Sequence, residues 1–321
     1  MSGCRIAFLV ALFAAGSLLG QAPGPRHALV HQEDLYIPGP PLDHVPSWAG
    51  SLLLGCDLCQ SREPILWTVD RQGRRDEMTF RLPDAAYVSA EVIASGPDGA
   101  LVVAGYALSA DSRIASYIAW ISPDRKRQIV NRVWPFRPYV VSVAPDGTIW
   151  AVGPVKIGDT TDDQSSNVLR HYEPSGRLLA TVDVKARGYN GLASVSDGSK
   201  LRTSSDRVGW LTHACEYIEF SFSAVEMGRY ECPNGIQDSQ MVGGIALSSE
   251  GDLLVGGRTG PPSPFELDRA TKTWNPVSVP ADILRRPYEV LGFDGSTLVT
   301  QSSGRLQRFT LGEAPAPSNG H

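Results

Sequence analysis

Short apolar runs recur along the chain, each followed by a tight polar turn and a second apolar run. The two clearest copies span residues 92–105 and 141–153, with a Pro-Asp-Gly turn at 97–99 and at 145–147. Proline presets φ, aspartate binds the local backbone, and glycine accepts a positive φ, so the tripeptide suits a tight turn between strands. This alternation of apolar run and turn predicts β-hairpins along most of the chain.

Five turns of this kind recur with a regular spacing of 44 to 53 residues between their glycines. The glycines are Gly99, Gly147, Gly198, Gly251 and Gly295. A second hairpin pattern follows each first one, as at 117–121 and 168–172, so each unit supplies four strands. A period near 50 in an all-β pattern is typical of propeller blades. We therefore predict an all-β fold, a β-propeller of six blades with four antiparallel strands each, with five and seven blades left open.

The two ends of the repeat region predict how the ring closes. The last unit lacks a fourth strand, and an apolar segment at 27–37 precedes the first unit. We expect this segment to complete the last blade, because a closed ring leaves no open sheet edge at the join. The sequence thus predicts one propeller domain at 27–311 and a disordered, proline-rich tail at 312–321.

The N-terminus has the layout of a secretory signal peptide. Arg5 precedes an apolar run at 6–19, and small residues follow it, so we expect cleavage of residues 1–20. The run is too short to span a bilayer, and no later segment reaches that length, so the mature chain is expected to have no membrane span. The predicted location is secreted or periplasmic.

Composition excludes several classes of protein. The 321 residues are 42% hydrophobic, which is enough for a buried core and excludes a disordered chain. The 32 glycines and 24 prolines disfavour long helices. A net charge of −5 argues against a nucleic-acid partner, which would need a basic face.

Four cysteines remain after the predicted cleavage, and an even number in an exported chain favours disulfides. Cys215 and Cys232 flank one predicted hairpin, whereas Cys56 and Cys59 form a C-x-x-C pair. No βαβ pattern surrounds that pair, so a thioredoxin-like redox role lacks its context. Zinc bound by all four thiols and unpaired or cross-paired cysteines are the alternatives.

The densest acidic segment is the candidate for a metal site. Asp159, Asp162 and Asp163 could supply oxygen ligands to calcium or another divalent metal, although the spacing is not that of an EF-hand. A solvated loop is the favoured interpretation, so no cofactor is expected. His213 and Cys215 could share one face of a strand as zinc ligands, but a disulfide at Cys215 would exclude this.

Tryptophans occur about once per unit. They are Trp67, Trp120, Trp150, Trp210 and Trp274. Such residues can stack on a glycan or peptide, but we favour packing between neighbouring blades, where large apolar side chains are needed.

The Pro-Asp-Gly repeats at 97–99 and 145–147, each followed by an apolar run and glycine, resemble the NHL, SMP-30 and YVTN-like group of β-propellers. The resemblance covers most of 48–311 and implies a propeller. Members of that group include metal-dependent lactonases, lyases and proteins that only bind. The lactonase ligands match no particular positions of this chain, so the resemblance assigns no site residues.

The functional prediction is an exported, rigid binding or interaction module for a protein, peptide or glycan. No G-x-S-x-G, P-loop or H-E-x-x-H motif occurs, so no catalytic residue is identified. The alternative is a metal-dependent hydrolase, lactonase or lyase with its site at the central channel. A third interpretation, a subunit of a cell-envelope assembly, predicts a large apolar surface patch.

Overall fold

The computed structural model describes most of the chain. The described residues are 25–36, 48–49, 52–70, 72–155, 167–183, 199–212, 214–236, 242–248, 250–257, 264–280, 289–302 and 305–314.

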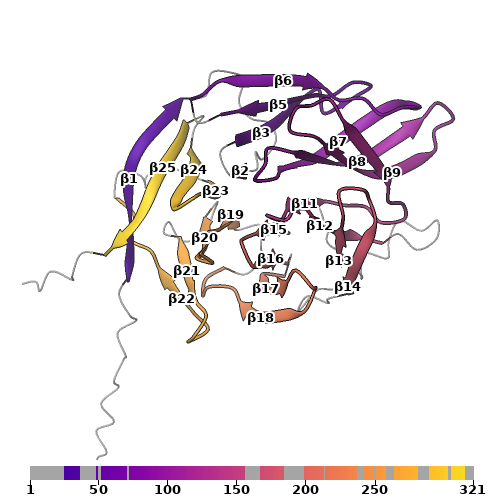
Figure 1. The fold of residues 1–321 in the computed structure, drawn as a ribbon. Helices are drawn as coiled ribbons and strands as arrows, with labels where there is room; N and C mark the ends of the chain where they lie inside the picture. The colour runs from indigo at the N-terminus through magenta and orange to yellow at the C-terminus, as the bar shows by residue number, and fades with distance from the viewer. Residues whose placement is uncertain are drawn as a thin grey trace, which may run out of the picture.

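Six antiparallel sheets stand side by side around a common centre (Figure 1). Blade one consists of β2 (Trp48–Ala49), β3 (Leu52–Asp57), β5 (Ile65–Val69) and β6 (Arg75–Thr79). Blade two contains β7 (Ala85–Ser95), β8 (Leu101–Ser109), β9 (Ile114–Ile121) and β10 (Gln128–Arg132). Blade three consists of β11 (Val140–Val143), β12 (Ile149–Pro154), β13 (Asn167–Tyr172) and β14 (Leu178–Asp183). Blade four consists of β15 (Lys200–Thr203), β16 (Arg207–Leu211), β17 (Glu216–Ser221) and β18 (Glu226–Glu231). Blade five consists of β19 (Val242–Leu247), β20 (Leu253–Gly257), β21 (Phe265–Asp268) and β22 (Thr273–Pro276). Blade six consists of β23 (Glu289–Asp294), β24 (Thr297–Ser302), β25 (Arg305–Glu313) and β1 (His27–Tyr36). This architecture confirms the predicted six-bladed β-propeller.

The ring closes through the N-terminal strand, as predicted. β1 pairs antiparallel with β25, from His27 opposite Glu313 to Tyr36 opposite Arg305. β25 therefore extends two residues beyond the end predicted for the domain at 311, because its last residues pair with the start of β1. At the centre, the first strands β2, β7, β11, β15, β19 and β23 contact one another in succession.

Blade two departs from the predicted four strands. The short strand β4 (Gln60–Ser61) leaves the connection between β3 and β5 of blade one and pairs with Ser89 and Val88 on the free edge of β7. Blade two is therefore a five-stranded sheet. The sequence pattern could not reveal this pairing, because two residues are too few to show an alternation.

The two faces of the ring differ in their connections. Because strands alternate in direction, the turns within the first and second hairpin of each blade lie at one end, here called the turn face. The remaining connections lie at the other end, here called the loop face. Connections on the turn face have six residues or fewer, whereas the one between β14 and β15 on the loop face has sixteen.

The turn chemistry follows the sequence prediction. Gly99 and Gly147 have φ values of 85° and 81°, which glycine adopts at little cost. The Asp98 carboxylate accepts a hydrogen bond from the Ala100 amide at 2.9 Å, so the turn satisfies its own polar groups.

The hydrophobic core lies between neighbouring blades. Each pair of adjacent blades shares a buried apolar cluster, and the last cluster joins blade six to blade one through Val299 and Trp67. Trp150 and Trp210 are also buried, and Trp120 and Trp274 pack against such clusters. Packing between blades, rather than a stacking surface, is therefore the main role of the repeated tryptophans.

The cysteines pair as two disulfides, Cys56–Cys59 and Cys215–Cys232. Cys215–Cys232 ties the start of β17 to the end of β18, so it closes the second hairpin of blade four. Cys56–Cys59 closes the short segment that leads into β4, and Ala90 donates its amide to the Cys59 carbonyl at 2.8 Å.

Removal of the hairpin disulfide should lower stability more than removal of the short one. A cross-link stabilises by restricting the unfolded chain, and the restriction grows with loop length. Cys215 and Cys232 are 17 residues apart, whereas Cys56 and Cys59 are 3 apart. We expect the Cys215→Ser/Cys232→Ser variant to lose about 3 kcal/mol of unfolding free energy and Cys56→Ser/Cys59→Ser about 2 kcal/mol. Denaturant unfolding under non-reducing conditions measures both losses. A larger loss for Cys56→Ser/Cys59→Ser than for Cys215→Ser/Cys232→Ser would contradict this prediction.

Candidate functional site

The candidate site contains a bulge in β7, the inner strand of blade two. The pairing of β7 with β8 shifts between Ala90 and Val92, so Glu91 is the extra, unpaired residue. A β-bulge redirects the side chain of the extra residue. Gly105 lies opposite, where a Cβ would stand 1.9 Å from the Ser89 carbonyl oxygen, so this close approach requires glycine.

The redirected Glu91 carboxylate meets a guanidinium from the next connection. Arg137, in the segment between β10 and β11, donates from Nη2 to Glu91 Oε1 at 2.9 Å. The linker also approaches blade three closely, because the Arg137 amide donates to the Pro154 carbonyl at 2.9 Å. A Cβ on Gly153 would stand 1.8 Å from the Arg137 carbonyl oxygen, so this glycine lets the linker dock.

Tyrosine rings surround this ion pair. The Arg137 guanidinium lies 5.2 Å from the ring centre of Tyr106 and 5.1 Å from that of Tyr139, both within cation–π range. Tyr87 stands next to Tyr106, with ring centres 6.2 Å apart. We call Glu91, Arg137, Tyr87, Tyr106 and Tyr139 the tyrosine cluster; it lies at the junction of blades two and three.

The electrostatics of the tyrosine cluster fix its charges. Burial alone would lower the pKa of the Arg137 guanidinium, but the Glu91 carboxylate outweighs it and raises this pKa above the ordinary value. Burial, reinforced by Tyr106, raises the pKa of the Tyr87 hydroxyl. At neutral pH the Arg137 guanidinium is therefore charged and the Tyr87 hydroxyl is neutral.

The tyrosine cluster is reachable from solvent. The side chains of Glu91 and Arg137 are 22% and 42% exposed. Glu91 Oε2 and Arg137 Nε are covered and have no hydrogen-bond partner among the described residues. In a folded protein such atoms cost free energy unless a partner is supplied.

Exposed apolar side chains fall into separate groups. Leu58 (67% exposed) and Trp134 (46% exposed) lie in connections of the loop face, and Ile114 begins β9 at the same face. A second group lies on the outer strands of blades three and four or beside them. Its members are Leu178, Leu179, Val225 and Met227.

A shallow groove of about 840 Å³ lies beside blade two, and no residue of the tyrosine cluster lines it. Its walls come from the connection between β6 and β7, the start of β7, and strand β10. An ion pair between Arg81 and Glu63, 3.1 Å apart, crosses it. Both side chains are well exposed, so this pair contributes little order.

The residues predicted as metal ligands fall outside the described residues. Asp159, Asp162, Asp163 and His213 all lie there, so the structure says nothing of a calcium or zinc site at them. Within the described residues, no group of three or more His, Cys, Asp or Glu side chains is placed to hold a metal ion.

The described histidines have structural surroundings. His27 Nδ1 lies 2.5 Å from Glu266 Oε2, and His31 Nε2 lies 2.7 Å from Asp34 Oδ1. His171 is buried and stacked on Trp150, with ring centres 4.0 Å apart, and burial lowers its pKa despite the nearby Asp146 carboxylate. His171 is therefore neutral at neutral pH.

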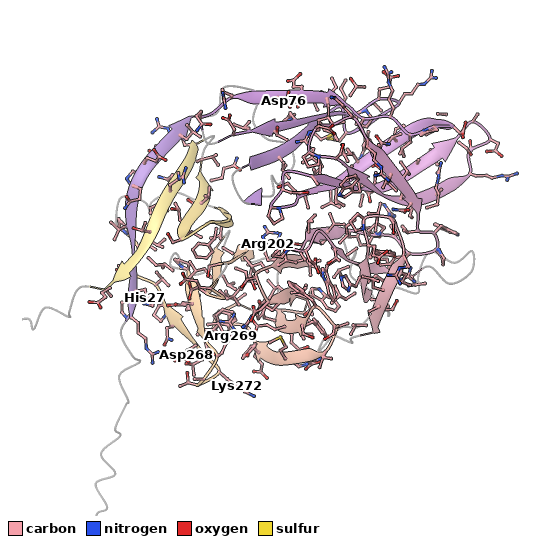
Figure 2. The ribbon with its side chains drawn as sticks, viewed as in Figure 1. His27, Asp76, Arg202, Asp268, Arg269 and Lys272 are labelled. Carbon is pink, nitrogen blue, oxygen red and sulfur yellow. A yellow bond between two sulfur atoms is a disulfide. The ribbon has the colours of Figure 1, made fainter. Side chains whose placement is uncertain are left out.

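Charged side chains elsewhere connect neighbouring elements. Figure 2 shows Arg202, from β15, toward the middle of the ring, and its Nη1 donates to the Leu201 carbonyl at 2.9 Å. Arg269 lies on blade five, close to Asp268 (Figure 2), and pairs with the buried Glu219 of blade four. The Arg269–Glu219 pair joins blades five and four on the turn face.

The tyrosine cluster was missed by sequence reasoning. Glu91 and Arg137 are 46 residues apart and belong to no linear motif. A usable signal was present, because Glu91 is the one charged residue in the inner strand 85–95, which is otherwise apolar or uncharged. Superposition of the repeat units would have singled it out.

No helix in the described part of the chain is long and apolar enough to cross a membrane. No protein-family model matches the chain, and no curated protein matches it. The NHL, SMP-30 and YVTN-like group is therefore not identified by these comparisons.

Several solved structures are similar to this chain at low sequence identity. A structural genomics protein of unknown function from Bacteroides thetaiotaomicron has a TM-score of 0.50 at 7% identity, with 89% of this chain and 76% of that chain covered. The WD40 β-propeller domain of Doa1 has a TM-score of 0.45 at 10% identity, with 88% and 97% covered. Saccharomyces cerevisiae Sqt1 has a TM-score of 0.49 at 13% identity, with 83% and 70% covered. At these identities the likeness concerns the fold alone.

Proposed function

We propose that the chain is an exported, non-catalytic binding module that holds its partner on the loop face, at the tyrosine cluster. The observation that carries the proposal is an aromatic and charged cluster on a bulged inner strand, on a fold whose strands provide a rigid support. Binding residues tend to lie on connections that a rigid scaffold positions. The cluster combines aromatic faces with a few fixed polar groups, as ligand sites usually do.

The arrangement of the Glu91 carboxylate favours binding over catalysis. Its partner Arg137 is held charged, and the two groups are already paired in the free protein. A carboxylate occupied in this way is a poor general base, because proton transfer would first have to break the pair. The same pair is a good recognition element, because its two groups are already held together before a ligand arrives.

Two features support export. The N-terminal segment has the pattern of a signal peptide, and the structure joins four cysteines in two disulfides. Disulfides persist in oxidising compartments, as outside the cell or in a periplasm. We expect the chain to be recovered without residues 1–20 from the culture medium or the periplasm of expressing cells. Recovery of the uncleaved chain from the cytoplasm would contradict this part of the proposal.

A binding test compares the two faces of the ring. The mature chain would be applied to arrays of defined glycans and defined peptides, alongside an Arg137→Ala/Trp134→Ala variant on the loop face. The matched control is Arg177→Ala on the turn face, where Arg177 pairs with Glu173 in an exposed turn. We expect the loop-face variant to weaken binding by about tenfold or more and the control to leave it unchanged.

Two results would contradict the proposed function. One is binding that the turn-face variant removes and the loop-face variant retains. The other is the absence of binding to every glycan and peptide on the arrays by a chain whose thermal melt shows it to be folded.

A further inference from the structure

We propose that the tyrosine cluster is a subsite for a neutral saccharide, whose neighbouring hydroxyls bridge Glu91 and Arg137. This inference rests on the proposed function and adds the chemical class of the ligand. It starts from a comparison of the blades with one another, because repeated units show which residues the fold itself requires.

Bulges recur in the inner strands of this propeller without a carboxylate at the extra position. The inner hairpins of blades five and six are bulged as well, between Val242 and Gly244 and between Val290 and Gly292. The extra residues there are Gly243 and Leu291. Glu91 in blade two therefore adds a charge that the backbone geometry does not demand.

The pairing of Glu91 with Arg137 selects against charged ligands. An anion would compete with Glu91 for the guanidinium, and a cation would compete with Arg137 for the carboxylate. Either would leave a partly buried charge without its partner, which is costly. A hydroxyl both donates and accepts, so two adjacent hydroxyls can serve the carboxylate and the guanidinium without separating them.

The unpartnered atoms match this chemistry. Glu91 Oε2 can accept and Arg137 Nε can donate, and neither has a partner among the described residues. Both atoms are covered, so a ligand hydroxyl reaches them only after the guanidinium shifts. Arg137 can make that shift, because its side chain is long and 42% exposed.

The tyrosines supply the second half of sugar recognition. A saccharide ring has an apolar face that packs on an aromatic side chain, while its rim of hydroxyls needs polar partners. Tyr106 and Tyr139 lie on the Arg137 guanidinium, so aromatic and polar groups meet at one place. The raised pKa of Tyr87 keeps its hydroxyl neutral. A peptide would use the same aromatic faces but offers no row of adjacent hydroxyls.

The test uses isothermal titration of the mature chain with three probes. They are short neutral oligosaccharides of glucose, galactose or mannose, the corresponding uronic-acid oligosaccharides, and acidic peptides. We expect at least one neutral series to bind, the uronic-acid form to bind about tenfold more weakly, and Glu91→Gln to weaken the neutral series by about tenfold or more. Glu173→Gln removes the carboxylate of another Glu–Arg pair, on the turn face, and should change nothing.

Hydrogen exchange on the unmutated chain keeps the test decisive if Glu91→Gln fails to fold. A bound neutral oligosaccharide should slow amide exchange in 133–139 and in β7. Protection confined to other segments would overturn the inference. Binding of peptides alone, still sensitive to Arg137→Ala/Trp134→Ala, would overturn the saccharide subsite while leaving the proposed function standing. Binding of no probe would overturn both.

Discussion

A mature chain that lacks residues 25–36 is expected to lose its cooperative thermal transition or to melt far below the intact chain. These residues form β1, the fourth strand of blade six, which pairs with β25 along nearly its whole length. Each backbone hydrogen bond of such a ladder contributes about 1 kcal/mol, and Leu29 is buried in the core between blades five and six. The sum is comparable to the whole stability of a domain, about 5–15 kcal/mol.

The loss is expected to be large because β1 also joins two blades. The Leu29 amide donates to the Ser278 carbonyl at 2.7 Å, and the Ser278 amide donates to the His27 carbonyl at 2.9 Å, so β1 touches blade five. Two side-chain contacts add to this, an ion pair from Arg26 to Asp268 and a hydrogen bond between His27 and Glu266. His27 and Asp268 are labelled in Figure 2. Deletion would open the ring at the join between its last and first blades and expose the edge of β25.

A point variant separates the strand from its side chains. Arg26→Ala/His27→Ala removes both side-chain contacts but keeps the backbone ladder, and the side chains of Arg26 and His27 are 57% and 41% exposed. We expect this variant to lose about 1 kcal/mol or less. A synthetic peptide of residues 25–36, added to the deleted chain, should restore part of the melting temperature. An unchanged melt after deletion would show that β1 does not hold the ring closed.

The blade architecture was predictable because it depends on local chemistry. Turn glycines such as Gly99 and Gly147 need a positive φ, and the apolar strands around them must be buried, so both requirements repeat with every blade. The closing strand was predictable for the same reason, because a missing fourth strand at one end matched a spare apolar segment at the other. Each inference needed only the order of residues along the chain.

The tyrosine cluster was not predictable, because its contacts depend on how neighbouring blades are placed. Glu91 reaches Arg137 only because a bulge redirects its side chain and a linker docks on blade three. The strand β4 escaped prediction as well, since it belongs to blade one in sequence and to blade two in space. Superposed repeats predict the fold from what the blades share. They can single out Glu91 as a difference between blades, but they do not show that Arg137 is its partner.

The buried carboxylate of Glu219 shows a second contact of this kind, on the turn face between blades four and five. Arg269 Nη2 donates to Glu219 Oε1 at 2.6 Å, and Arg207 Nη1 donates to Oε2 at 3.2 Å. The Tyr217 hydroxyl donates to Glu219 Oε1 at 3.2 Å. A Cβ on Gly209 would stand 2.0 Å from the Tyr217 hydroxyl oxygen, so glycine leaves room for it. Glu219 thus offsets two guanidinium charges in a buried place, and Arg269 is 50 residues away in the chain.

Glu219→Ala should therefore destabilise the ring by about 3–5 kcal/mol, because two partly buried arginines would face each other without their shared counter-charge. Glu226→Gln is the matched control: Glu226 pairs with Arg229 in the same blade but is exposed, so its loss should cost about 0–1 kcal/mol. Denaturant unfolding measures both variants. The double variant Glu219→Ala/Arg269→Ala should lose less than the sum of its single changes, because the second removes a charge that the first left unpaired. Equal losses of unfolding free energy for Glu219→Ala and Glu226→Gln, or strict additivity in the double variant, would mean that the Glu219–Arg269 pair does not join blades four and five.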